Sequence, residues 1–251
     1  MSPTPLLEVT DLRKSYGGVQ AVQGVSFALD PGEVVAVVGD NGAGKSTTIK
    51  MVSGAVRRDH GTIRWEGREV DIGSPDDARG LGIETMYQDL ALVPDLDVAA
   101  NVFLGQEPLK RVLGILPVLD RDGMRTRARM LLDRVNIRIP SLDQPVRSLS
   151  GGQRQATAIA RFLLNEHPKL IIMDEPTAAL GVQEQRKVMD LIRTLKEQGI
   201  TILVISHNLE HVFEVCDRII VLRAGQVEGV VRTAEVDKQA VVSLVMGGGR
   251  A

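Results

Sequence analysis

Hydrophobic residues along the chain follow two different spacings. Short runs rich in Val and Ile predict buried strands, at residues 25–29, 34–38, 62–65, 82–87, 169–173, 200–205 and 218–222. Segments with apolar residues three or four positions apart predict helices, at residues 45–53, 98–104, 121–135, 153–164, 183–198 and 209–215. Because strands and helices alternate over most of the chain, we expect an α/β fold with a largely parallel sheet that helices cover on both faces.

The middle of the chain breaks this alternation. Residues 95–165 carry helical patterns only, which predicts a helical subdomain. The flanking stretches, 1–94 and 166–251, carry the strands and are expected to form one sheet core. We therefore expect a single domain over 1–251 in which the helical subdomain is an insertion.

Neither a membrane span nor an export signal is predicted. The longest apolar cluster, 112–119, contains Pro117 and is far shorter than the about 20 residues that a span needs. The first residues, MSPTPLLEVTDL, have no basic segment followed by a long apolar one. The pattern predicts no element for the segment 105–120.

Composition narrows the class of partner. The 251 residues include 30 basic and 32 acidic side chains spread along the chain, with a formal net charge of −2. Because there is no basic stripe to neutralise a phosphate backbone, nucleic acid is not an expected partner. The single cysteine, Cys216, excludes a disulfide within the chain and is typical of a reducing compartment.

A glycine-rich segment, GDNGAGKST at 39–47, satisfies the phosphate-binding pattern G-x-x-x-x-G-K-[ST]. Backbone N–H groups and a helix N-terminus favour phosphate oxygens, Lys45 reaches the β- and γ-phosphates, and the Ser46 hydroxyl can ligate Mg²⁺. The alternative is an ordinary glycine turn, but the segment joins a predicted strand to a predicted helix, as phosphate binding requires. The candidate residues are Gly39, Asn41, Gly42, Ala43, Gly44, Lys45, Ser46 and Thr47.

Two acidic residues end a second apolar strand, in KLIIMDEP at 169–176. Asp174 is therefore expected at the carboxyl edge of the sheet, where open α/β folds bind ligands, and it can hold Mg²⁺ directly or through water. Glu175 can polarise an attacking water as a general base. The alternative is that both are solvated loop acids before Pro176, which a neighbouring phosphate-binding loop disfavours.

Two glycines stand at the start of a helical pattern, in SLSGGQRQATAIARFLL at 148–164. Gly151 and Gly152 each disfavour a helix by roughly 1 kcal/mol relative to alanine. Helix stability does not explain them.

Together these motifs resemble the nucleotide-binding subunit of ATP-binding cassette (ABC) transporters, from residue 7 to about 229. The resemblance implies a P-loop NTPase with a mostly parallel core sheet, an antiparallel β subdomain and an inserted helical subdomain. It also implies ATP and Mg²⁺ as ligands. LSGGQ resembles the family's signature motif, which faces the γ-phosphate on a second subunit. The residues thereby implied to bind ATP in trans are Ser150, Gly151, Gly152 and Gln153.

Three further positions match the family residue by residue. Tyr16 matches the aromatic that stacks on adenine, although a lone tyrosine is more often a half-buried core residue. Gln88 matches the catalytic glutamine that reaches Mg²⁺ and water, on a loop that contacts the membrane subunit. His207 matches the catalytic histidine that contacts the γ-phosphate. Each is weak alone, and their shared order makes the set specific.

One position departs from the family pattern. After EPTAAL the family usually has an aspartate that helps couple the two sites of the dimer, and here the residue is Gly181. The segment TAALGVQE resembles bacterial importers of the ribose, xylose and fructose kind, many of which fuse two cassettes in one chain. Coupling through this loop is therefore in question, whereas the nucleotide site is not.

The resemblance implies the ATP-hydrolysing subunit of an import system for a monosaccharide or related carbohydrate. Such a subunit forms a homodimer, drives transmembrane permease subunits, serves a solute-binding protein indirectly, and lies on the cytoplasmic face of the inner membrane. Three alternatives stay open: an importer ATPase for another solute such as amino acids, a soluble non-transport ATPase, and a module that binds ATP without hydrolysing it. Glu175 argues against the last.

Overall fold

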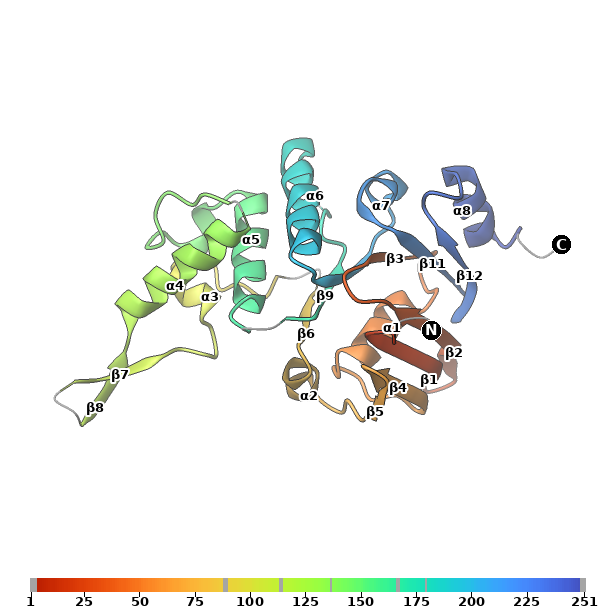
Figure 1. Cartoon of the computed structure of the whole chain (residues 1–251), viewed down its shortest axis with the longest axis horizontal. Helices are drawn as coiled ribbons and strands as arrows, with labels where there is room; N and C mark the ends of the chain where they lie inside the picture. Colours follow the sequence, from red (N-terminus) through yellow and green to blue (C-terminus); the bar gives the residue numbers. More distant parts are fainter. Residues whose placement is uncertain are drawn as a thin grey trace. The chain divides into compact units, whose positions relative to one another are not determined.

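A computed structural model describes residues 4–87, 90–112, 115–135, 137–165, 168–178 and 180–248 (Figure 1). The chain forms two compact units. The first, here called the sheet unit, comprises residues 1–85, 168–176 and 195–251. The second, the helical unit, comprises residues 86–167 and 177–194. The predicted limits of the helical subdomain, 95 and 165, stay a prediction.

A six-stranded sheet with the order β12-β11-β3-β10-β9-β6 runs through the sheet unit. Its strands are β3 (Val34–Val38), β6 (Ile83–Met86), β9 (Leu170–Asp174), β10 (Thr201–Ile205), β11 (Arg218–Arg223) and β12 (Gln226–Arg232). β3 pairs in parallel with β10 and β11, β10 pairs in parallel with β9, and β12 is antiparallel to β11. The largely parallel sheet is confirmed, and the carboxyl ends of β3, β9 and β10 meet at one edge.

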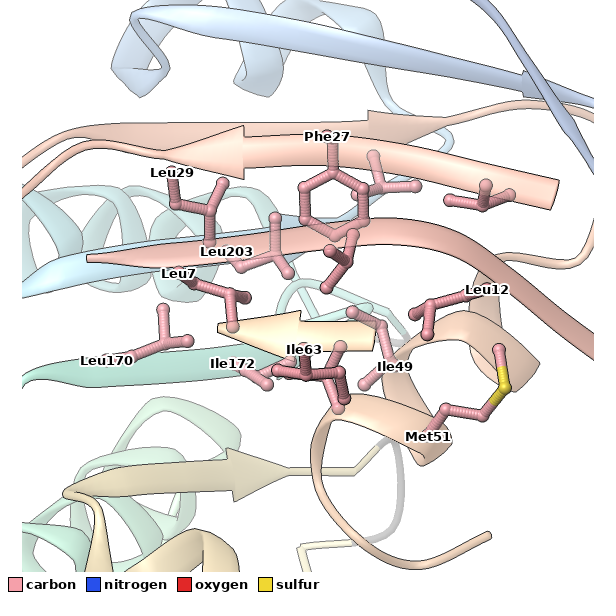
Figure 2. Close-up of a cluster of buried hydrophobic side chains, with 14 of the residues drawn as sticks. Leu7, Leu12, Phe27, Leu29, Ile49, Met51, Ile63, Leu170, Ile172 and Leu203 are labelled. Carbon is pink, nitrogen blue, oxygen red and sulfur yellow. The ribbon is translucent and has the colours of Figure 1, made fainter. Parts of the chain in front are cut away.

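A second sheet in this unit is fully antiparallel, with the order β2-β1-β4-β5. Its strands are β1 (Leu7–Tyr16), β2 (Val19–Leu29), β4 (His60–Trp65) and β5 (Arg68–Val70). Figure 2 shows how side chains of this sheet, of helix α1 (Lys45–Val52) and of the parallel sheet gather in one buried cluster. The labelled members are Leu7, Leu12, Phe27, Leu29, Ile49, Met51, Ile63, Leu170, Ile172 and Leu203. Helix α1 is therefore anchored by apolar packing, which fixes the loop before it.

The remaining helices of the sheet unit are short. They are α2 (Pro75–Gly80), α7 (Leu209–Val215) and α8 (Lys238–Met246). The sequence pattern predicted α7 and missed the other two. No helix in the described part of the chain is long and apolar enough to cross a membrane.

Helices dominate the helical unit, which contains α3 (Val98–Val102), α4 (Arg121–Arg134), a 3-10 turn (Val146–Ser148), α5 (Gly151–Phe162) and the first part of α6 (Val182–Glu197). The buried Asn101, on α3, is hydrogen-bonded to the loop that precedes this helix. Its side-chain amide donates to the carbonyl oxygens of Val93, Leu96 and Asp97, and its Oδ1 accepts from the Val93 N–H at 2.7 Å. One polar side chain thus satisfies several backbone groups of an irregular loop.

The unassigned segment 105–120 contains a β-hairpin. Strands β7 (Leu109–Val112) and β8 (Leu116–Leu119) pair antiparallel as a separate two-stranded ribbon. Leu109 and Leu116 are 66% and 60% exposed. Both strands have only four residues and β8 contains Pro117, so they are too short and irregular for the alternation that a strand prediction needs.

The single cysteine is a structural residue. Cys216 follows α7 and is buried, and its backbone N–H donates to the Val212 carbonyl oxygen. Burial, with a smaller contribution from the neighbouring Asp217 carboxylate, raises the pKa of the thiol to about 12. The thiol therefore stays protonated at neutral pH.

Candidate functional site

The glycine-rich loop connects β3 to α1. At two of its positions, the backbone conformation and the close neighbouring atoms allow only glycine. Gly39 has a φ of 150°, and a Cβ atom there would overlap the carbonyl oxygen of Leu222. Gly44 has a φ of 96°, and its Cβ would lie 2.6 Å from the Ala21 carbonyl oxygen. The loop is thus pressed against two neighbouring strands and cannot carry side chains at these positions.

The start of α1 is left open toward a ligand. Gly44 occupies the N-cap position without a side-chain cap, and the first turn has no acidic residue. Within the described part of the chain, the N–H groups of Lys45, Ser46 and Thr47 therefore have neither an intrahelical acceptor nor a side-chain cap, and the helix dipole adds positive potential. Ser46 is exposed beside them. This arrangement suits a phosphate group.

Lys45 leans over its own loop. Its Nζ donates to the carbonyl oxygens of Gly39 at 2.7 Å and Asp40 at 2.9 Å. The ammonium group is therefore held above the loop that its neighbours form, where a bound phosphate would meet it. The exposed Asn41 and Gly42 lie at the tip of this loop.

Asp174 ends β9 at the same edge of the sheet and is half-buried. Burial raises the pKa of its carboxyl and the Glu175 carboxylate raises it further, whereas Lys45 and Lys50 act in the opposite direction. The described residues contain no cluster of three or more His, Cys, Asp or Glu side chains that would hold a metal alone. Mg²⁺ commonly takes one or two carboxylates and completes its shell with phosphate and water oxygens, so one carboxylate and the Ser46 hydroxyl fit nucleotide-bound Mg²⁺.

Replacing Asp174 with asparagine is expected to raise the thermal unfolding midpoint of the nucleotide-free protein at pH 7. The pKa of Asp174 is higher in the folded chain than in the unfolded one, so the ionised carboxylate costs stability above the folded pKa. This cost disappears below the unfolded pKa, and the gain should shrink toward about pH 4. Calorimetry in EDTA at both pH values measures the difference. A variant less stable than wild type at pH 7 contradicts this argument.

Glu175 and His207 form a close pair that the sequence did not predict. His207 Nδ1 lies 2.9 Å from Glu175 Oε2, with the glutamate side chain 16% exposed and the histidine 75% exposed. Glu175 has a φ of 51°, and its N–H donates to the Ile205 carbonyl oxygen at 3.0 Å. A left-handed glutamate is a strained conformation of the kind that collects at functional sites. The carboxylate is thereby fixed at the edge of the sheet.

The turn that carries His207 is built from local hydrogen bonds. The buried Ser206 follows β10, and its Oγ accepts from the Asn208 N–H at 3.1 Å. Asn208 caps α7 by accepting from the N–H groups of Glu210 and His211. His207 is thus held between a strand end and a helix start, with its ring exposed.

Two other predicted residues have different outcomes. Tyr16 ends β1 with 48% of its surface exposed, and Lys14 Nζ lies 5.7 Å from the ring centroid. The ring is accessible for stacking, and contact with adenine stays a prediction. Gln88 lies outside the described residues.

The signature segment caps its own helix. Ser150 is the N-cap of α5, its Oγ accepts from the Gln153 N–H, and the Gln153 side chain accepts from the Ser150 N–H at 3.1 Å. The S-x-x-Q spacing is a local signal for such a capping box, and it places the helix start two residues before the predicted one at 153. Gln153 Nε2 also donates to the Arg138 carbonyl oxygen.

The two signature glycines are not equivalent. A Cβ at Gly151 would overlap Leu180 Cδ2, and the Gly151 N–H donates to Glu184 Oε1 at 3.1 Å. At Gly152 the nearest atom to a Cβ is Lys187 Cδ at an ordinary 3.7 Å. At position 151, packing against Leu180 within the same chain therefore favours glycine over any larger residue. The described residues give no such reason for a glycine at position 152. Binding of ATP by this segment stays a prediction.

Comparison with protein families matches residues 22–178, well over half of the chain, to the family described as ABC transporter. The chain belongs to the ABC transporter family. It is an ABC-type ATPase, as its phosphate-binding loop, its Asp-Glu pair and its signature segment predicted. The predicted fold class is also confirmed.

Curated relatives of this ABC ATPase are import proteins. The chain is 50% identical to the xylose/arabinose import ATP-binding protein of Sulfolobus acidocaldarius over 88% of this chain and 86% of that one. It is 49% identical to the fructose import ATP-binding protein of Rhizobium meliloti, over 90% and 88%. A ribose import ATP-binding protein of Rubrobacter xylanophilus is 44% identical over 97% of this chain, which spans 47% of that protein.

Solved structures share the fold. A cassette of an ABC transporter in its ADP conformation has a TM-score of 0.83 at 27% identity, over 97% of this chain and 99% of that one. A dimeric bacterial ABC transporter cassette has a TM-score of 0.74 at 26% identity, over 90% and 98%.

Proposed function

We propose that the chain is the ATP-hydrolysing subunit of an import system that carries a monosaccharide or a related carbohydrate. The observation that carries this proposal is the near end-to-end identity of 49–50% with import proteins named for xylose/arabinose and for fructose. Because the named sugars differ among relatives, the proposal commits to the class of substrate rather than to one sugar.

Within each chain, the loop from Gly39 to Thr47 cradles the phosphates of ATP through its N–H groups, and Lys45 neutralises the β- and γ-phosphates. Ser46 and Asp174 hold Mg²⁺ together with Gln88, and the ion, when bound, neutralises developing charge on the phosphate oxygens. Glu175 orients the attacking water and accepts its proton, His207 contacts the γ-phosphate, and Tyr16 stacks on adenine.

A second copy of the chain completes each site. The segment from Ser150 to Gln153 of one copy meets the ATP on the loop of the other, so that ATP joins the two copies and hydrolysis releases them. The dimeric cassette with a TM-score of 0.74 supports this arrangement. Permease subunits in the membrane receive the motion near Gln88, and a solute-binding protein delivers the sugar. The chain is therefore peripheral, on the cytoplasmic face of the membrane.

Purification of the native complex from gently solubilised membranes tests the proposal. Mass spectrometry should find a polytopic permease and a solute-binding protein beside this chain. The recovered binding protein is then titrated with ribose, xylose, arabinose, fructose and a panel of amino acids. Binding of a monosaccharide supports the proposal. Binding of amino acids alone, or recovery of ribosomal or DNA-repair proteins without a permease, overturns it in favour of an alternative.

Replacing Gly152 with aspartate is expected to abolish ATP-driven dimerisation while nucleotide binding by the monomer stays at the wild-type level. Outside its chain neighbours and its own helix backbone, the nearest described atom to the added Cβ is Lys187 Cδ at an ordinary 3.7 Å, and in the proposed dimer the new carboxylate would face the γ-phosphate of the partner's ATP. Light scattering with ATP and a fluorescent nucleotide titration measure the two properties.

Gly80→Asp is the control for adding a carboxylate to a helical glycine away from the signature segment, because Gly80 is exposed and no described residue beyond its chain neighbours and its own helix backbone lies within 4 Å of the added Cβ. ATP-driven dimers of the Gly152→Asp variant would contradict the trans site. Gly151→Asp is a poorer choice, since its side chain also overlaps Leu180 within the chain.

A further inference from the structure

We propose that Glu184 is a positioning residue that fastens the signature helix α5 to the start of α6. One carboxylate oxygen, Oε1, accepts from the Gly151 N–H at 3.1 Å, and the other, Oε2, accepts from the Gly181 N–H at 3.2 Å. All three residues belong to the helical unit. The inference rests on the proposed function, because its consequence is for the ATP site that two chains share.

On the α6 side, Glu184 replaces a cap that the sequence lacks. Gly181 immediately precedes α6, and its carbonyl oxygen accepts from the N–H groups of Glu184 and Gln185, both at 2.9 Å. Glycine has no side chain with which to cap the helix. The carboxylate three residues later returns to the N-cap N–H, which is one half of a capping box.

On the α5 side, the same carboxylate satisfies the first N–H group of the helix. The Ser150 hydroxyl accepts from the Gln153 N–H, and Glu184 accepts from the Gly151 N–H. The Gly152 N–H is then the first-turn donor to which the described residues give no acceptor. A carboxylate at the N-termini of two helices is favourable at both, since each end carries positive partial charge.

The connection has a consequence for the shared ATP site. Gly181 follows Glu175 by six positions, so the loop from the candidate general base ends where Glu184 is fixed. Through the Gly151 N–H, Glu184 links the end of that loop to the segment that faces the partner's nucleotide. This chain lacks the aspartate that the family usually has at position 181. Glu184 instead supplies a carboxylate that connects the end of the loop after Glu175 to the segment proposed to bind the partner's ATP.

The test compares wild type with Glu184→Ala and with Gln183→Ala, an exposed neighbour in the same helical turn for which the described residues supply no hydrogen-bond partner. Hydrogen exchange should become faster at both Gly151 and Gly181 in Glu184→Ala only. ATPase activity is measured against protein concentration, and the concentration for half-maximal activity should rise about tenfold in Glu184→Ala. Binding of a fluorescent ATP analogue to the monomer should not change.

A second variant separates positioning from stability. Gly181→Ser in the Glu184→Ala background supplies a new N-cap for α6 but no acceptor for the Gly151 N–H. It should restore the thermal unfolding midpoint and leave the dimerisation defect. Recovery of both properties overturns the inference, as does wild-type behaviour of Glu184→Ala. A wild-type protein that neither hydrolyses ATP nor dimerises would refute the proposed function instead.

Discussion

Glu175→Gln is expected to lower kcat for ATP hydrolysis by about 10²-fold to 10⁴-fold. Glutamine has the same shape but cannot accept the proton of an attacking water. The carboxylate is only 16% exposed and is held by His207 Nδ1 at 2.9 Å, so the amide keeps the position and loses the chemistry. Steady-state phosphate release and a nucleotide titration measure kcat and ATP affinity separately.

The affinity for ATP should be retained or increase, because the substitution removes a negative charge from the phosphate site and leaves the phosphate-binding loop intact. Glu69→Gln, on the exposed strand β5, removes the same charge elsewhere in the sheet unit and should leave kcat unchanged. Wild-type turnover in the Glu175 variant would show that another group activates the water.

Gly39→Ala should lower the free energy of unfolding by roughly 4 kcal/mol and abolish nucleotide binding. A positive φ alone costs an alanine about 1–2 kcal/mol. The added methyl group would also overlap the backbone oxygen of Leu222, which is fixed within β11 and cannot rotate away. Urea denaturation gives the free energy, and a fluorescent nucleotide gives the affinity.

Gly42→Ala is the control from the same loop. Gly42 has a φ of 82°, but no described residue other than its chain neighbours lies within 4 Å of the added Cβ. Its variant should therefore lose only the roughly 1–2 kcal/mol of backbone strain. Equal losses for the two alanine variants would mean that the contact with Leu222 does not hold the loop.

Where a strand is apolar along its whole length, the pattern was sufficient to predict the fold. Strands β3 and β10 are buried throughout and read as nearly continuous runs of Val, Ile and Leu. Strands β1 and β2 mix buried and exposed residues over ten and eleven positions, and only residues 25–29 were predicted. The Gly17-Gly18 pair between them is a hairpin signal that would have extended the prediction.

Part of the candidate site could be predicted from local sequence motifs, and the rest depends on contacts between segments that are distant in the sequence. The phosphate-binding loop and the Asp174-Glu175 pair follow from short motifs, because strand, turn and helix are adjacent in sequence. The pairing of Glu175 with His207 depends on β9 lying beside β10, which no local pattern specifies. The contact of Glu184 with Gly151 likewise depends on how two distant helices pack.

Because Cys216 is buried, the protein can be labelled at an introduced surface cysteine without first replacing its native one. Its thiol is buried and has a pKa of about 12, and maleimide reagents attack the thiolate. A cysteine introduced on the surface, for example at Met130, which is 63% exposed on α4, would be the sole reactive thiol. Fluorophore pairs or spin labels on two such chains would report the distance between them through the ATP cycle, with every native residue of the interior left in place.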